Sequence, residues 1–246
     1  MPVFSEGIKK FWANNIIMKT PEFDVIGIGT VCWDIVGRVP QLPDADEKAE
    51  MTELLQQGGG PTATGIVAVA RLGGKAAIWG SIGSDDFGRQ CIDEFEREGV
   101  DTQHLQIAKQ ETTQFAFCVA VEGTGQRCIY YKPGTAPKLL PEEISPEAVC
   151  NCRALLIGHH HGAAAVQGAK LARTAGIPVV LDVERLSQWD EALLDVADWP
   201  ILPVEYVMAK TGLENPFFAG ETLAQKHQKR IILTLGDQGC VAFTEA

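Results

Sequence analysis

Gln-Gly-Gly-Gly-Pro-Thr-Ala-Thr, residues 57–64, opens the stretch that decides the fold, and Ser-Ile-Gly-Ser-Asp-Asp-Phe-Gly, residues 81–88, closes it. Three consecutive glycines give a backbone that can take positive φ and lie close to a ligand. Pro61 and Thr62 can then open a helix, whose first N–H groups and positive dipole end favour a polar or anionic ligand. The sequence therefore predicts a glycine loop and a helix at a binding site, but such a motif alone is weak evidence.

The residues that follow strengthen this interpretation. Gly73-Gly74 ends the helix, Ala76–Trp79 is a short apolar strand, and Ser84 or Asp86 can cap a helix over 87–98. A Gly-Gly-x-x-Ala-x helix, an Arg-Leu-Gly stop and a Gly-x-Asp-Asp-x-Gly turn in this order resemble the N-terminal signature of the ribokinase-like (PfkB) sugar kinases. The resemblance covers residues 23–246, and residues 1–22 are interpreted as an N-terminal extension.

Composition sets limits on the function. The chain has 246 residues, 46% of them hydrophobic and 22% charged, which suits one large soluble α/β domain. A formal net charge of -11 argues against nucleic acid as a partner. Seven irregularly spaced cysteines are typical of reduced thiols in a cytoplasmic protein. Neither a membrane-spanning run nor a signal peptide is evident, so we expect a cytoplasmic protein without a membrane partner.

Strand and helix patterns predict the architecture. The apolar run 23–29 is a buried first strand, and apolar strands alternate with helices from Ala154 onward. Short strands within 35–54 and 112–132 interrupt this alternation. We therefore expect an α/β fold: a doubly wound, mostly parallel sheet with helices on both faces and a small antiparallel β lid. In the family, such a lid covers the sugar and often forms a dimer interface, which implies a homodimer through the β lid.

The predicted sugar site combines residues from the first strand, the glycine stretch and the lid. Asp34 follows the first strand, where open α/β sheets bind ligands, although a surface-turn role is the alternative. Ala116 and Cys118 share one face of a lid strand. The resemblance implies that Asp34 binds sugar hydroxyls, that Arg127 approaches the sugar or its phosphate, and that the remaining substrate contacts come from Gly59, Gly60, Thr64, Ala116 and Cys118.

The resemblance also implies ATP and Mg²⁺ as cofactors. Pro203-Val204-Glu205 stands where the family often has Asn-x-x-Glu, so Glu205 would organise magnesium and phosphates through water. The segment 234–239 reads Thr-Leu-Gly-x-x-Gly, which the family places beside the nucleotide. Thr234, Gly236 and Gly239 are therefore the expected ATP-binding residues, although the same pattern is common in hairpin turns.

Two departures from the family pattern affect the expected function. Thr64 stands where the family usually has Asn, a form that resembles ketohexokinase and sulfofructose kinase and favours a ketose-like substrate. The second family signature, Asp-Thr-x-Gly-Ala-Gly-Asp, does not occur in the sequence. In the family its glycines hold the transferred phosphoryl group and its last Asp is the base. We therefore expect a truncated chain that lacks the C-terminal part of the fold and contains no catalytic residue, and we expect it to be inactive.

Four alternative interpretations remain open from the sequence. A nucleoside could replace the sugar, or the chain could be a non-catalytic sugar-binding or regulatory derivative of a kinase. Tyr206-x-x-x-Lys210 matches the Tyr/Lys pair of short-chain dehydrogenases, although the glycine-rich first turn of those reductases is missing. His159-His160-His161 suggests a metal, but three successive residues cannot converge on one ion, and a role in lining the sugar cleft is more plausible.

Overall fold

Two sheets organise the part of the chain that the computed structural model describes, residues 20–244. The proposed N-terminal extension lies almost wholly outside these residues. Within them the main sheet has the strand order β13-β12-β11-β10-β9-β1-β4-β5, with β6 beside β4. Its strands are β1 (Phe23–Ile28), β4 (Ala76–Gly83), β5 (Val100–Asp101), β6 (Leu105–Ala108), β9 (Cys152–Gly158), β10 (Val179–Asp182), β11 (Trp199–Pro203), β12 (Ile231–Thr234) and β13 (Cys240–Phe243).

The main sheet is parallel except at one edge, where β13 runs antiparallel to β12. Helices connect its strands and cover both faces, as the alternating sequence pattern predicts. The helices are α2 (Pro61–Arg71), α3 (Asp86–Arg97), α4 (Pro146–Val149), α5 (Gly162–Thr174), α6 (Asp190–Val196), α7 (Val204–Thr211) and α8 (Pro216–His227), with short 3-10 turns at Pro141–Glu143 and Gly236–Gln238. The fold is the predicted doubly wound α/β fold.

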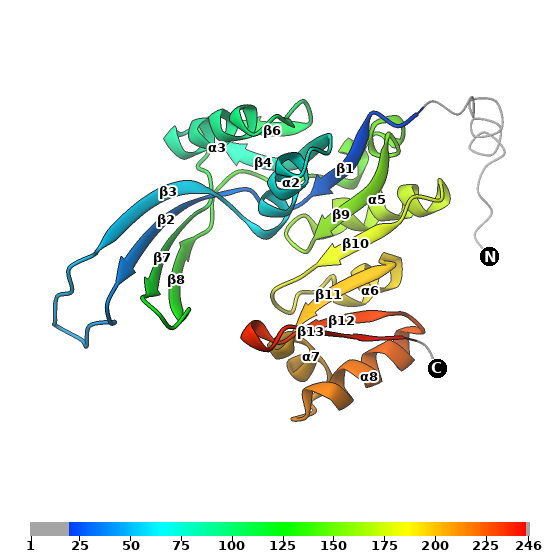
Figure 1. The fold of residues 1–246 in the computed structure, drawn as a ribbon. Coiled ribbons are helices and arrows are strands. Elements are labelled where there is room, and N and C mark those ends of the chain that lie inside the picture. The colour runs from blue at the N-terminus through cyan, green and yellow to red at the C-terminus, as the bar shows by residue number, and fades with distance from the viewer. Residues whose placement is uncertain (1–19, 245–246) are drawn as a thin grey trace.

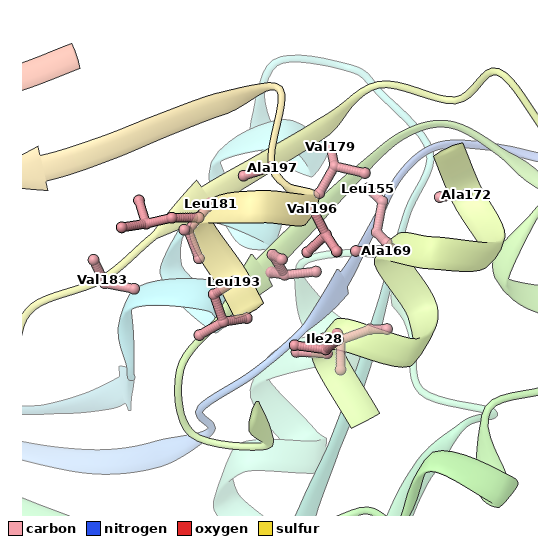
Figure 2. Packing of buried hydrophobic residues seen from close by; sticks show 14 of the residues in the cluster. Ile28, Leu155, Ala169, Ala172, Val179, Leu181, Val183, Leu193, Val196 and Ala197 are labelled. Atoms are coloured by element: carbon pink, nitrogen blue, oxygen red, sulfur yellow. The ribbon is translucent and has the colours of Figure 1, made fainter. Parts of the chain in front are cut away.

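Two hydrophobic cores lie on opposite faces of the main sheet. Ile66 of α2 packs with Ile78 and Ile82 on one face. On the other face α5 and α6 pack against β1, β9 and β10, as Figure 2 shows. α5 approaches closely because its buried side is glycine and alanine: a Cβ at Gly168 would lie 2.5 Å from Ile28 Cδ1. These cores fix the carboxyl ends of the central strands, from which the loops of the site emerge.

The lid is a separate four-stranded sheet with the order β3-β2-β7-β8. Its strands are β2 (Cys32–Val39), β3 (Glu53–Gly59), β7 (Phe115–Val121) and β8 (Arg127–Lys132). They project away from the main sheet in Figure 1. The two outer pairs are antiparallel and the central pair, β2 with β7, is parallel. Chain order explains this: β2 and β7 arrive from separate strands of the main sheet and leave the body in the same direction.

The structure corrects three local expectations. The second lid strand is 53–59 and extends beyond the expected range of 35–54, so Gly58 and Gly59 lie in a strand that pairs with β2 and do not form a loop. Asp34, which was expected just after the first strand and before the lid strands, lies inside β2. The cap of α3 is Asp85, where Ser84 or Asp86 was expected. Glycines have low strand propensity, but a complete ladder with β2 outweighs that preference here.

Asp85 links α3 to the segment that precedes the lid strand β7. Its Oδ1 accepts hydrogen bonds from the Gly88 N–H (3.0 Å) and the Thr113 hydroxyl (2.7 Å), and its Oδ2 accepts one from the Thr113 N–H (3.0 Å). Burial alone would raise the pKa of Asp85, but these hydrogen bonds outweigh burial and hold it below its ordinary value. Because the pKa in the folded state is lowered, this carboxylate stabilises the fold at neutral pH, and the contribution is lost as the pH falls through that pKa.

Replacing Asp85 by Ala is expected to lower the free energy of unfolding by about 2–3 kcal/mol at pH 7, the sum of a lost helix cap and an unsatisfied partner at Thr113. Urea titrations of both proteins measure the difference. The control is Asp86→Ala, which removes the neighbouring exposed carboxylate and its ion pair with Arg89 and should cost about 0.5 kcal/mol. Equal losses of unfolding free energy in the two variants would show that the Asp85 hydrogen bonds do not stabilise the contact between α3 and the segment before β7.

Candidate active site

A cavity of about 190 Å³ lies between the lid and the carboxyl ends of β1, β9 and β10. The chain proceeds from β1 to β4 on one side and from β9 through β10 on the other, so this is the switch point where doubly wound sheets bind ligands. Its lining residues come from both halves of the molecule: Thr30, Cys32, Asp34, Gly60, Pro61, Gln114, Ala116, Cys118, Ile129, Tyr131, His159, His160, Glu184 and Arg185.

Asp34 provides a carboxylate in the wall of this cavity. It projects from β2 against Gly59, and a Cβ at position 59 would lie 2.1 Å from the carboxylate. The Cys32 thiol donates a hydrogen bond to Asp34 Oδ1 at 3.0 Å. Burial and the Asp34 charge raise the pKa of Cys32, so the thiol keeps its proton. Burial also raises the pKa of Asp34, although the Cys32 hydrogen bond acts in the opposite direction.

Gly60 connects the lid to α2 beneath the same cavity. It is the N-cap of the helix and has φ 95°, a conformation that favours glycine. A Cβ at this position would lie 2.6 Å from the carbonyl oxygen of Thr30. Both the backbone conformation and the space therefore require glycine at position 60, whereas Gly59 is required by the Asp34 side chain.

The other predicted sugar residues are only partly brought together. Ala116 and Cys118 line the cavity with Asp34 and Gly60, on the lid face that sequence alternation predicted for them. Thr64 is exposed and lines a different cavity between α2 and α3. Arg127 is exposed on β8, on the same side as Ile129 and two pairs farther along the strand than the cavity wall. The structure therefore groups four of the seven predicted substrate residues around one space, with Gly59 directly behind Asp34.

Several lining residues were not identified from the sequence. Glu184 and Arg185 follow β10, and Ile129 and Tyr131 come from β8, whose pairing with Ala116 and Cys118 places them on the cavity face. The alternation of β8 could have indicated the latter two. The position of Glu184 and Arg185 depends on the order of strands in the sheet, which the local sequence does not encode.

The three successive histidines have different surroundings. His159 and His160 line the cavity, whereas His161 is buried and its Nδ1 accepts a hydrogen bond from the Leu139 N–H at 3.0 Å. Burial lowers the pKa of His160 to about 4 and that of His161 to about 3, so both rings are neutral near pH 7. No group of three potential metal ligands occurs within residues 20–244. The positions of His159 and His160 match the expected role in lining the cavity.

The expected nucleotide residues gather at the carboxyl ends of β11 and β12, on the same edge of the sheet as the cavity. Thr234 pairs with Pro203 in the strand register, and Glu205 follows in the first turn of α7 with an exposed side chain. Gly236 and Gly239 have φ values of 62° and 88°, and no atom lies within 4 Å of a Cβ built at either position. Within residues 20–244 the structure gives the Glu205 carboxylate no ion pair, and the backbone at Gly236 and Gly239 is open.

The Tyr206 and Lys210 pair has a structural role. Tyr206 is buried, and burial and the charges of Asp190 and Glu191 raise its pKa. Lys210 forms ion pairs with Asp190 at 3.5 Å and Glu191 at 2.8 Å. A reductase of the Tyr/Lys type needs a tyrosine whose pKa is lowered. The environment of Tyr206 does the opposite, so the geometry argues against the dehydrogenase interpretation.

The pfkB family carbohydrate kinase model matches residues 23–246, and the chain belongs to this family. An ATP-dependent ribose-1-phosphate kinase from Halopiger xanaduensis is 30% identical over 161 residues, which cover 65% of this chain and 54% of that protein. Fructokinase-2 from Solanum lycopersicum is 26% identical over 244 residues, which cover 90% of this chain and 72% of that enzyme. The chain thus spans about half the length of the first relative.

Solved structures confirm the fold. The ribokinase of Arabidopsis thaliana, determined with ribose and ATP, superimposes with a TM-score of 0.74 at 24% identity and covers 91% of this chain and 75% of that one. The likeness at this identity concerns the fold. In addition, no helix within residues 20–244 is long and apolar enough to span a membrane.

Replacing Asp34 by Asn is expected to weaken sugar binding about 10- to 100-fold, because hydrogen bonds to a charged group contribute roughly 1.5–3 kcal/mol each. The same change should raise the Tm at pH 7, since a raised pKa means that the folded state is penalised once Asp34 ionises. The gain in Tm should shrink as the pH falls and the wild-type carboxyl takes up its proton.

Calorimetry with D-fructose and D-ribose, together with thermal unfolding from pH 4 to pH 8, checks both halves of this expectation. Glu53→Gln is the control, because it neutralises an exposed lid carboxylate that pairs with Arg38 outside the cavity. Unchanged sugar affinity in Asp34→Asn would remove Asp34 from the site, and a pH-independent Tm difference would contradict the stated cause.

Replacing Gly60 by Ala is expected to destabilise the protein more than the matched variant Gly73→Ala. Both glycines have positive φ, so each alanine carries a conformational cost of about 1–2 kcal/mol. Only at Gly60 does the added methyl group meet backbone, the Thr30 carbonyl, which should add a further 1–3 kcal/mol or so. Urea unfolding of the two variants gives the comparison, and equal destabilisation would show that the backbone at Thr30 yields without cost.

Proposed function

We propose that this protein is an ATP-dependent sugar kinase that transfers a phosphoryl group to a sugar hydroxyl. The observation that supports this most is the cavity at the switch point, where Asp34 of the lid strand β2 and the Gly59–Gly60 backbone meet the carboxyl ends of the main-sheet strands. A carboxylate in this position would accept hydrogen bonds from sugar hydroxyls, and the lid residues Ile129 and Tyr131, which line the cavity, would cover a bound sugar. Membership of the pfkB family supports the same reaction class.

ATP and Mg²⁺ are the proposed cofactors. Thr234, Gly236 and Gly239 would hold the nucleotide at the carboxyl end of β12, and Glu205 would bind the hydrated magnesium through water. When bound, the metal neutralises phosphate charge that develops during transfer. The nucleotide residues and the sugar cavity lie along one edge of the main sheet, with the loop after β10 between them. This order of strands would bring the two substrates toward each other from neighbouring sites.

We propose a ketose-like substrate, which the Gly-Gly-Gly-Pro-x-Ala-Thr form of residues 58–64 and the similarity to a plant fructokinase support. A nucleoside is the alternative within the same family. A non-catalytic sugar-binding or regulatory role is the alternative from another class. We further propose a cytoplasmic location and a homodimer formed through the lid, since Leu54 and Tyr130 are exposed on the lid face that points away from the cavity.

A polypeptide of residues 1–246 is expected to bind sugar without turning over ATP. The sequence contains no Gly-Ala-Gly-Asp segment, and in the described site Asp34 has the role of holding substrate. A general base typically contributes ~10²–10⁴-fold to the rate and a lost oxyanion-type donor ~10²–10³-fold, so their combined loss should bring turnover below detection.

The measurement is a coupled ADP-release assay with ketoses, aldoses and nucleosides, run beside calorimetric titrations of the same compounds. Binding without ADP release is the expected result. Sugar-dependent ADP release above the ATPase background would show that an Asp carboxylate within these residues acts as the general base for phosphoryl transfer. Failure of every sugar and nucleoside to bind would overturn the proposed function itself.

A further inference from the structure

Most arginines of the described chain are paired with carboxylates. Six of the nine have a carboxylate oxygen within 4 Å, as expected in a protein with 32 acidic and 21 basic residues: Arg38, Arg71, Arg89, Arg97, Arg153 and Arg173. Arg230 instead lies over the Trp199 ring, 4.6 Å from its centroid. Arg127 and Arg185 are the remaining two: Arg185 lines the cavity, and Arg127 lies on the cavity side of β8, beyond Ile129. Unpaired arginines are therefore concentrated at the candidate site.

Arg185 is held at the junction between body and lid. Its Nη1 donates a hydrogen bond to the Tyr131 hydroxyl at 2.5 Å, and its guanidinium carbon lies 5.2 Å from the centre of the Tyr131 ring. One of its five N–H donors is thus used, and within residues 20–244 the structure gives the others no protein acceptor. A guanidinium with a fixed position and open donors, in the wall of a cavity, suits an oxygen anion.

Arg127 supplies a second cation on the lid side of the opening. It lies on the cavity side of β8. Desolvation raises the pKa of Glu184, and the charges of Arg185 and Arg127 act against this increase. Arg127 thus belongs to a lid strand and Arg185 to the body, in the loop after β10. Burial, followed by the charge of Lys138, lowers the pKa of His160.

Asp34 supplies the carboxylate on the lid side of the cavity. It lies on β2, beside the glycine backbone, whereas Arg185 lies in the loop after β10. Glu184 also lines the cavity, and desolvation and the charges of Asp182 and Asp34 raise its pKa, which reduces its repulsion of a bound anion. A ligand that matches this polarity presents hydroxyl groups to Asp34 and an anionic group to Arg185.

We propose that Arg185, with Arg127 across the opening, binds an anionic substituent of the sugar, so that the substrate is a sugar phosphate or a sugar acid and not a neutral sugar. This inference rests on the proposed kinase function and names its substrate class. A neutral sugar would leave the guanidinium donors without a charged acceptor, whereas a phosphate or carboxylate engages them in paired hydrogen bonds. Arg185 is thereby a specificity-determining residue.

Calorimetric titration of residues 1–246 without nucleotide tests this assignment with matched ligands. D-fructose is compared with D-fructose 6-phosphate and with a 2-keto sugar acid, and D-ribose with D-ribose 1-phosphate. We expect at least one anionic member to bind about tenfold or more tightly than its neutral partner, and inorganic phosphate to compete with it. The phosphate and carboxylate arms show which anion the site takes.

Arg185→Gln should remove this preference by weakening the anionic ligand about tenfold or more while leaving the affinity for the neutral partner unchanged. Arg185→Lys should restore part of it, and Arg127→Gln should have a smaller effect of the same kind. Arg230→Gln is the matched control, because this arginine also lacks a carboxylate partner but lies over Trp199, away from the cavity. Tyr131→Phe removes the hydrogen bond to Arg185 and keeps the ring.

Equal binding of neutral and anionic sugars would overturn the inference and leave the kinase proposal intact. An equal loss of both ligands in Arg185→Gln, reproduced by Tyr131→Phe, would also overturn it, because Arg185 would then only position the lid. An effect of Arg185→Gln on ATP binding alone would assign the residue to the nucleotide. Failure of all sugars to bind would overturn the proposed function and this inference together.

Discussion

The Asp34 carboxylate occupies the space that any side chain at position 59 would need, and this contact determines how closely the lid strands β2 and β3 approach each other. Strand β3 can approach β2 at this point only because residue 59 has no Cβ, and the chain then turns at Gly60 into α2. The same few residues therefore set the register of the lid, the start of a helix that packs on β1 and β4, and the direction of the carboxylate. The shape of the whole cleft therefore depends on glycine at these positions.

The site contains carboxyl groups whose burial lowers the stability of the fold. Desolvation raises the pKa of Asp34, Asp182 and Glu184. Ionising these carboxyls therefore costs more free energy in the folded protein than in the unfolded chain, so their charges lower the stability of the fold. The two large apolar clusters on either side of the main sheet stabilise the scaffold that holds these charges. Such a division, with a stable core and a costly polar site at the strand ends, is typical of proteins that gain function at the expense of stability.

The sequence predicted the doubly wound sheet and the lid because apolar strands, helices and turns alternate with clear periodicity. Gly58 and Gly59 were wrongly interpreted as a loop, since local preference for irregular backbone ignores the partner strand β2, whereas Gly60 has the expected positive φ at the start of α2. The place of Asp34 near the glycine stretch was anticipated from the end of β1, whereas its position inside a strand was not. Arg185 was not identified from the sequence because its contact with Tyr131 joins the loop after β10 to a lid strand 54 positions earlier in the chain.

The lid and the body are linked on both sides of the cavity, and this has a consequence for ligand binding. On one side the chain itself connects them, through residues 29–31 between β1 and β2 and through Gly60. On the other side the connection is the Tyr131–Arg185 contact between β8 and the loop after β10. A ligand that touches Asp34 on the lid and His159 or Arg185 on the body interacts with both halves at once. Such a ligand binds most tightly to the conformation in which the lid and body groups are closest together. The difference between its affinities for the closed and the open conformation sets how far it shifts the lid toward closure.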